Sequence, residues 1–385
     1  MMPERATRRS ASPARTRVAV VLNDLGPGGA QRAAIEQAGC LDPAVWQVEV
    51  ASLELKPPQG AEHRLPRRIP VRRPGLGGLT GWLREFQPDL IHAHLARATI
   101  ACSLASPLAG NPALVATCHN LSDWQERRHH PVRLLARAAL HRCDTILAVS
   151  EAVRRAIAAH DTVLGDRTQV LRNGADLSAF ASVRGMRAAA REVLGYPPGS
   201  FVVGAVARLD PRKGLDVLLS AASEALPRVP GLEVLIVGDG ADRQRLAAHS
   251  RELGLSARAR FVGAQSDVRP YLAALDLFAA PSRSEGLGIA LVEALAAGVP
   301  VAGADVGGIP EVLEGGSAGW LLPAGVKEWS DAIVRASRSP AELDRLSLAG
   351  LERANEFSID RTRDRLAGLY RAALGQTGAS EADAA

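Results

Sequence analysis

The stretch PSRSEGLGIALVEALAAGVPV, residues 281–301, contains two glutamates eight residues apart, Glu285 and Glu293. Glu285 falls in a turn rich in serine and glycine, whereas Glu293 falls in an apolar segment typical of a buried helix. A buried carboxylate needs charged or hydrogen-bonding partners. Two explanations are open: Glu293 forms a buried salt bridge, or both carboxylates accept hydrogen bonds from the hydroxyls of a sugar or ribose.

The composition indicates a globular protein with room for two domains. The chain has 385 residues, and its hydrophobic fraction is 47%. No apolar run reaches the roughly 18–20 residues of a membrane span. Residues 1–15 include arginines but no apolar segment, so we interpret them as a disordered basic tail rather than a signal peptide. The four cysteines lack metal-binding spacing, which favours a reduced cytosolic compartment.

Net charge gives little support for nucleic-acid binding, because +5 is small and the charges are dispersed. The use of lysine is more informative. Only three of the 46 basic residues are lysines, namely Lys56, Lys213 and Lys327. Because arginine is used almost everywhere else, each lysine position is a candidate for a role that needs an ammonium group.

Strand, turn and helix patterns alternate along the whole chain. The apolar runs are continuous, as in parallel strands covered by helices on both faces. The candidate strands are 17–22, 47–52, 90–92, 114–117, 145–149, 169–171, 201–207, 233–237, 260–262, 277–280 and 299–302. The clearest helices follow Gly28 and Ser150, and Ser150 is a plausible N-cap. We therefore predict two doubly wound α/β domains, joined near residues 175–200.

Turns after the strands are the candidate binding sites, because doubly wound sheets bind ligands beyond the carboxyl ends of their strands. The first such turn is NDLGPGGAQR, residues 23–32. Gly28 and Gly29 let the backbone approach a ligand, and the following helix offers free N–H groups to an anion. A simple tight turn is the alternative interpretation.

The turn RLDPRKG, residues 208–214, contains Arg208 and Lys213. Two cations at the end of a strand could clamp a diphosphate, and a compact ammonium at a phosphate is one reason to keep a lysine. The alternative is a solvated basic turn. In segment 281–301, Gly286 and Gly288 free the turn, and a helix that starts near Gly288 would direct its N–H groups into the same crevice.

Three histidines follow or end strands in the first half of the chain. His119 directly follows a predicted strand and could face the space between the domains, although a lone histidine is more often structural. His92 and His94 lack a third metal ligand at suitable spacing. Since the chain also contains no Asp-x-Asp pair, we expect no metal site and no cofactor.

Residues 127–142, RRHHPVRLLARAALHR, form a predicted basic amphipathic helix. Arg133, Arg137 and His141 recur at a spacing of four residues, beside apolar Leu134 and Leu135. Such a helix could lie against an anionic membrane. A solvated helix packed on its own domain is an equal alternative.

Taken in order, these motifs resemble the retaining glycosyltransferases of family 4, which have the GT-B fold. The resemblance extends from about residue 17 to residue 375, and the glutamates of segment 281–301 are its strongest signature. The matching motifs are GGAQR (28–32), DLIHAH (89–94), VS (149–150), NGAD (173–176), ARLDPRKGLD (207–216), LIVGDG (235–240), FVG (261–263), segment 281–301 and GGIPE (307–311).

The resemblance implies the architecture: two Rossmann-like domains that face a deep interdomain cleft. Residues 16–182 would form an N-terminal acceptor-binding domain, and residues 183–357 would form a C-terminal nucleotide-sugar-binding domain. A final helix, 358–375, would cross back to the first domain, followed by a flexible tail over 376–385.

The resemblance also assigns roles to residues. It implies catalytic roles for Arg208, Lys213, Glu285 and His119. It implies donor binding by Gly28, Gly29, Arg208, Lys213, Gly238, Glu285, Gly286, Leu287, Gly288 and Glu293. The two cations would hold the departing diphosphate, Glu285 the donor sugar and Glu293 the ribose. His119 would lie near the reacting carbon, and a donor phosphate oxygen would help to deprotonate the acceptor.

The expected function is transfer of a sugar from a nucleotide sugar to a glycan, glycolipid or lipid-linked acceptor in bacterial polysaccharide or cell-envelope synthesis. A UDP-sugar is the expected donor, since UDP is the commonest nucleotide for this pattern. We expect a cytoplasmic protein. Whether residues 127–142 also contact the inner face of the cytoplasmic membrane is left open.

Three alternatives differ from this function. A nucleotide-sugar epimerase of the same architecture would need no acceptor. A non-catalytic partner subunit of a glycan-assembly complex would typically have lost a charged residue of the site. All four of these residues are present here, namely Arg208, Lys213, Glu285 and Glu293. A two-domain solute-binding protein would need an export signal that the sequence lacks.

Overall fold

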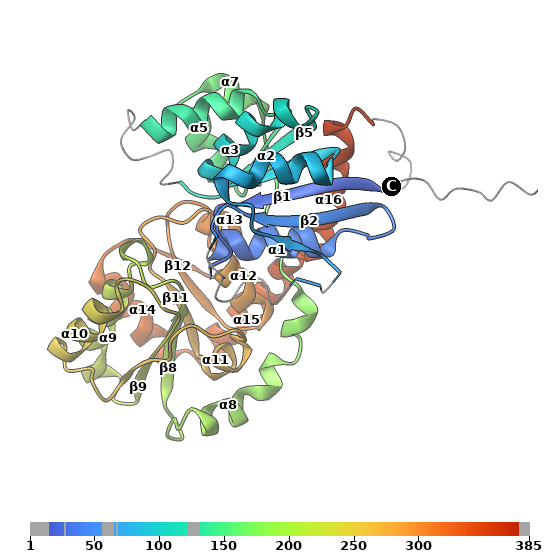
Figure 1. Cartoon of the computed structure of the whole chain (residues 1–385). Helices are drawn as coiled ribbons and strands as arrows, with labels where there is room; N and C mark the ends of the chain where they lie inside the picture. The colour runs from blue at the N-terminus through green and yellow to red at the C-terminus, as the bar shows by residue number, and fades with distance from the viewer. Residues whose placement is uncertain (1–14, 27, 56–64, 67, 122–130, 377–385) are drawn as a thin grey trace, which may run out of the picture.

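The computed structural model describes residues 15–26, 28–55, 65–66, 68–121 and 131–376. Its strands form two separate parallel sheets, and Figure 1 shows helices packed around each of them. This arrangement confirms the predicted fold class of two doubly wound α/β units. The expected basic tail over 1–15 and flexible tail over 376–385 lie almost entirely outside the described residues.

The first sheet has the strand order β3-β2-β1-β4-β5-β6-β7. Its strands are β1 (Thr16–Leu22), β2 (Trp46–Ser52), β3 (Val71–Arg72), β4 (Leu90–His94), β5 (Ala113–Cys118), β6 (Thr145–Ala148) and β7 (Thr168–Val170). Its helices are α1 (Gly29–Cys40), α2 (Gly75–Phe86), α3 (Ala96–Ala105), α5 (Pro131–His141), α6 (Glu151–Ala158) and α7 (Thr162–Arg167). Along β1, Val18 and Val20 join one buried cluster and Ala19 and Val21 join another. Both faces of the sheet are therefore covered, as the continuous apolar pattern predicts.

The second sheet has the order β10-β9-β8-β11-β12-β13. Its strands are β8 (Phe201–Val206), β9 (Leu232–Val237), β10 (Ala259–Phe261), β11 (Leu277–Ala280), β12 (Val301–Ala304) and β13 (Trp320–Leu322). Its helices are α8 (Arg187–Val193), α9 (Leu215–Ala225), α10 (Arg243–Glu252), α11 (Arg269–Ala274), α12 (Ile289–Ala296), α13 (Ile309–Val312), α14 (Val326–Arg338) and α15 (Pro340–Ala354). The last helix of the chain is α16 (Ile359–Ala373).

The sequence-based strand assignments differ from the structure in a few places. The strands β3 and β13, of two and three residues, were not predicted. The strand predicted at 299–302 lies at 301–304 instead. Pro300 has no N–H to donate, and only its carbonyl joins the sheet by accepting a hydrogen bond from Phe278 N at 2.8 Å.

The helix α16 returns to the first sheet and packs beside α1 (Figure 1, red). The hydroxyl of Tyr370 lies 2.6 Å from Nδ1 of His92 on β4, and its ring meets that of Trp46 edge-on, with centroids 5.5 Å apart. The chain reaches this position past Gly174, where a Cβ would lie 2.7 Å from the carbonyl oxygen of Ser358. The core of the first half is thus completed by a segment that follows the whole second half.

Replacement of Tyr370 by phenylalanine tests this packing. The change removes the hydroxyl but keeps the ring, so it leaves the buried His92 Nδ1 without its partner. We expect a loss of about 1–3 kcal/mol in the free energy of unfolding, measured by urea denaturation. Tyr271→Phe is the matched control, since within the described residues its hydroxyl makes no hydrogen bond. Equal stability of both variants would show that the Tyr370 contact contributes nothing.

Candidate active site

The turn between β11 and α12 lies where the carboxyl ends of the two sheets meet. A Cβ at Gly286 would lie 2.0 Å from the carbonyl oxygen of His119 in the first half, so only glycine fits there. The hydroxyl of Ser150 donates a hydrogen bond to the Gly286 carbonyl at 2.6 Å. On its other side the turn is held by Gly308 N, which donates to the Glu285 carbonyl at 3.1 Å. This turn is therefore fixed by backbone contacts with both halves of the molecule.

The side chains of Lys213 and Glu285 form an ion pair at this turn. Nζ of Lys213 lies 2.5 Å from Oε2 of Glu285, and both side chains are largely buried. The contact depends on Gly214, whose left-handed φ of +62° and missing Cβ let the backbone come close to the Pro281 carbonyl. Two of the four predicted catalytic side chains are thus in direct contact, and a third, His119, belongs to the strand end beside Gly286.

Arg208 follows β8 and is half-exposed at the same end of the second sheet. Its Nε donates to Oδ2 of Asp210 at 2.9 Å. At the end of the neighbouring strand β9, Gly238 has a φ of +134°, and a Cβ there would lie 1.9 Å from the Ala207 carbonyl. The observed role of Gly238 is therefore close packing of two strand ends beside Arg208.

Two helix N-termini approach each other at the boundary between the halves. The helix α1 begins after Gly28, and α12 begins after Gly288, which has a φ of +94°. A Cβ at Gly29 would lie 3.7 Å from the Cγ2 atom of Ile289. Neither helix has a side-chain cap or an acidic residue in its first turn, so their positive ends offer amides to an anion. The side chain of Leu287 is buried, so the backbone amide is its polar group at this turn.

Glu293 lies within α12, is 1% exposed, and forms an ion pair with Arg32 of α1. The guanidinium of Arg32 also donates from Nε to Oε1 of Glu36 at 2.8 Å. A buried salt bridge, the first of the two explanations considered for Glu293, is therefore present. Its partner comes from the opposite half of the molecule, which the sequence spacing did not indicate.

The predicted site residue His119 belongs to a buried chain of histidines. Its Nε2 lies 3.0 Å from Nδ1 of His94, and the ring of His94 lies against that of His92, with centroids 4.0 Å apart and a tilt of 37°. Nε2 of His92 also lies 2.7 Å from the hydroxyl of Thr117. Burial lowers the pKa of His92 to about 3 and that of His119 to about 4, and it lowers the pKa of His94 well below its usual value. All three imidazoles are therefore neutral at pH 7.

Glu311 is a further contact between the halves that the sequence did not reveal. Its carboxylate accepts hydrogen bonds from the amides of Glu151 at 2.9 Å and Ala152 at 2.7 Å, so it occupies the N-terminus of α6. Arg172 lies 3.6 Å from the same carboxylate. Glu311 and Arg32 both fall in the motifs quoted above, but only the three-dimensional arrangement shows that they join the two halves.

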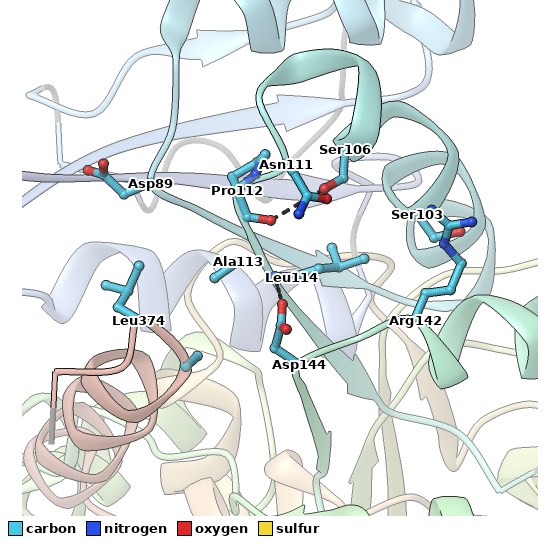
Figure 2. Close-up of a pocket in the computed structure, with 11 residues that line it drawn as sticks. Asp89, Ser103, Ser106, Asn111, Pro112, Ala113, Leu114, Arg142, Asp144 and Leu374 are labelled. Carbon is cyan, nitrogen blue, oxygen red and sulfur yellow. Dashed lines mark hydrogen bonds between the residues drawn. The ribbon is translucent and has the colours of Figure 1, made fainter.

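A cavity of about 390 Å³ lies at the amino ends of strands β4 to β6 in the first sheet, opposite the carboxyl ends that form the candidate site (Figure 2). Its acidic side chains accept hydrogen bonds from backbone amides: Asp89 from Arg17 N and Asp144 from Leu114 N, each at 2.7 Å. The hydroxyl of Ser106 similarly donates to the Pro112 carbonyl. None of the predicted site residues lines this cavity.

The described parts of the chain contain neither a cluster of metal ligands nor a helix suited to span a membrane. No group of three or more histidine, cysteine, aspartate or glutamate side chains there could hold a metal ion. No helix among the same residues has the length and apolar character needed to cross a bilayer.

Two models of known protein families match the two halves of the chain. The model described as Glycosyltransferase Family 4 matches residues 27–179, and that described as Glycosyl transferases group 1 matches residues 186–353. A D-inositol 3-phosphate glycosyltransferase of Saccharomonospora viridis is 34% identical over 312 residues, which cover 74% of this chain and 70% of that protein. The chain belongs to glycosyltransferase family 4. This membership confirms the resemblance carried by the sequence motifs.

Other relatives match over a shorter region. A D-inositol 3-phosphate glycosyltransferase of Nocardia farcinica is 41% identical over 220 residues, which are 54% of this chain and 48% of that protein. The chain thus spans about half the length of several curated relatives that it matches.

Solved structures support the GT-B architecture of this family member. HepE of Anabaena, in complex with UDP-glucose, matches with a TM-score of 0.80 and 25% identity over 92% of this chain and 99% of that chain. Sucrose-phosphate synthase from Thermosynechococcus elongatus matches with a TM-score of 0.81 and 22% identity over 94% and 100% of the two chains.

The neutral buried histidines predict how stability depends on pH. In the unfolded chain a histidine has a pKa near 6.5, so it binds a proton below that pH, whereas buried His119 does not until about pH 4. Stability is therefore lost as the pH falls from about 6.5 towards 4. We expect wild type to lose about 1 kcal/mol more than His119→Asn between pH 6 and pH 5, measured by urea unfolding. Equal losses would show that His119 takes up its proton in the folded state as well.

Proposed function

We propose that this chain transfers a sugar, with retention of configuration, from a nucleotide-diphosphate sugar to a hydroxyl acceptor. The observation that carries the proposal is the contact between Lys213 and Glu285 at the α12 N-terminus. An ammonium group has three donors, so Lys213 can keep its bond to Glu285 and still bind phosphate oxygens. In this pair, the cation that would bind phosphate lies directly beside the carboxylate that would bind sugar hydroxyls.

The remaining site residues have roles that fit this chemistry. Arg208 and Lys213 would hold the diphosphate and stabilise its charge as the bond to the sugar breaks. The amides of 286–288 would bind the same phosphates, and the Gly28–Gly29 turn would close on them from the first half. Neutral His119 would contact the donor sugar without adding charge. A donor phosphate oxygen would receive the proton of the acceptor hydroxyl.

UDP is the nucleotide that we propose first, because HepE, a structural relative, was solved with UDP-glucose bound. The names of the related proteins suggest D-inositol 3-phosphate as one acceptor to test, beside glycan and lipid-linked acceptors. An epimerase, the main alternative enzyme, would convert the donor without any acceptor. A non-catalytic subunit would bind the donor and convert nothing.

Donor identity and the role of Lys213 are tested together. UDP-, GDP- and ADP-sugars are screened for a concentration-dependent rise in melting temperature, and the best donor is then assayed with and without acceptors. We expect Lys213→Ala to lower turnover at least about a hundredfold, since one preorganised donor of this kind is worth about 10²–10³ in rate. Lys327→Ala is the matched control, because Lys327 is exposed and pairs with Asp331 far from the site. Near-normal transfer by the Lys213 variant would refute its assigned role.

We further infer that α5 contacts an anionic membrane through apolar side chains. Of the predicted helix 127–142, residues 127–130 lie outside the described part of the chain. Arg137 and His141 both bind Asp161, at 2.7 and 2.8 Å, so their charges are partly balanced within the domain. Leu134 and Leu135 are instead 52% and 57% exposed. Beside the exposed but paired Arg137 and His141, α5 thus presents apolar side chains to its surroundings.

Vesicle sedimentation tests this contact. We expect the double variant Leu134→Asp, Leu135→Asp to bind vesicles of phosphatidylcholine and phosphatidylglycerol at least about tenfold more weakly than wild type, since two apolar side chains no longer enter the interface. Leu348→Asp, at an equally exposed leucine of α15, should bind like wild type. If the α5 variant and the control bind alike, the contact does not involve this helix.

A further inference from the structure

The ion pair between Arg32 and Glu293 connects the two halves of the molecule at a buried position. Glu293 lies in α12 among Val292, Ala294 and other buried residues. A charge removed from water in this way is tolerated only with a close partner of opposite sign. Arg32 is that partner, and it belongs to α1 in the other half. The opposite half of the molecule therefore supplies a countercharge to Glu293.

Arg32 is itself held in place on its own helix. Glu36 lies one turn further along α1 and accepts a hydrogen bond from Nε of Arg32 at 2.8 Å. The nearby carboxylates of Glu293 and Glu36 raise the pKa of Arg32 against the opposing effect of burial. A guanidinium fixed by Glu36 on one side can orient a second carboxylate on the other, because its donors have a rigid planar geometry.

We propose that Arg32 is a positioning residue for Glu293 and that it makes recognition of the nucleotide ribose depend on contact between the two halves. The inference rests on the proposed function, in which Glu293 accepts hydrogen bonds from the ribose hydroxyls. A carboxylate can accept about four hydrogen bonds, so the contact with Arg32 and contacts with hydroxyls are compatible. Arg32 keeps the acceptor charged and oriented, and it does so without touching the nucleotide.

This arrangement links donor binding to closure in both directions. When the halves separate, Glu293 loses its countercharge, and its affinity for ribose falls. By linkage, a bound ribose must favour the closed arrangement by the same factor. Arg32, which lies in the first half beside the Gly28–Gly29 turn, thus controls the affinity of Glu293 in the second half for ribose.

The test measures how strongly each variant distinguishes UDP from 2′-deoxy-UDP and 3′-deoxy-UDP by titration calorimetry. Loss of a hydroxyl bound to a charged acceptor should weaken binding to wild type about tenfold or more. In Arg32→Met we expect UDP to bind about tenfold more weakly while the deoxy analogues change little, so the discrimination largely disappears. Arg32→Lys should restore part of it. Discrimination equal to wild type in Arg32→Met would overturn the inference.

Further variants separate this inference from the proposed function. If Glu293→Gln still discriminates like wild type, the ribose role of Glu293 fails, and with it this part of the proposed function. If Glu293→Gln loses discrimination but Arg32→Met retains it, only the role of Arg32 fails. Should Arg32→Met not fold, Glu36→Gln gives the same test, because it removes the support of Arg32 and should reduce discrimination. Arg335→Met, at an exposed arginine paired with Glu342, is the control that should leave it unchanged.

Discussion

The close approach of backbone to backbone around residues 285–288 is the constraint on which the site depends. A Cβ at Gly286 would overlap the His119 carbonyl, and one at Gly307 would overlap the Glu285 carbonyl, each at 2.0 Å. Real Cβ atoms do not approach other atoms so closely, so any other residue would push the segments apart. The position of the Glu285 side chain is therefore set by main-chain contacts, which are stiffer than contacts between side chains.

Charge complementarity between the halves adds to these contacts. Glu293 pairs with Arg32, and Glu311 accepts hydrogen bonds from the N-terminus of α6. Each of these carboxylates belongs to the second half and finds its positive partner in the first. Desolvation offsets much of the attraction in a buried pair of this kind, so its net contribution to stability is small. Separation of the halves would leave both carboxylates in need of new partners.

The sequence predicted the elements better than the contacts between them. The strands came from continuous apolar runs, and Ser150 was correctly predicted as an N-cap, since its hydroxyl accepts from Val153 N at 3.1 Å. The meeting of Lys213 with Glu285 was foreseeable in outline, because both follow strands of one parallel sheet. The partner of Glu293 was not foreseeable, because periodicity and spacing describe neighbours along one helix and carry no information about a facing domain. The same limit applies to Glu311, whose partners at the start of α6 belong to the opposite half.

The return of α16 to the first sheet affects the order in which the chain can fold. Domains generally fold during synthesis from the N-terminus onward. Here the first sheet is made early, but Tyr370, which covers Trp46 and binds His92, is synthesised only after the entire second sheet. Until then the first half lacks Leu366 and Leu369, which later complete one of its buried apolar clusters. The second half can thus reach its native state first, and the nascent first half is the part of the molecule in need of protection from aggregation.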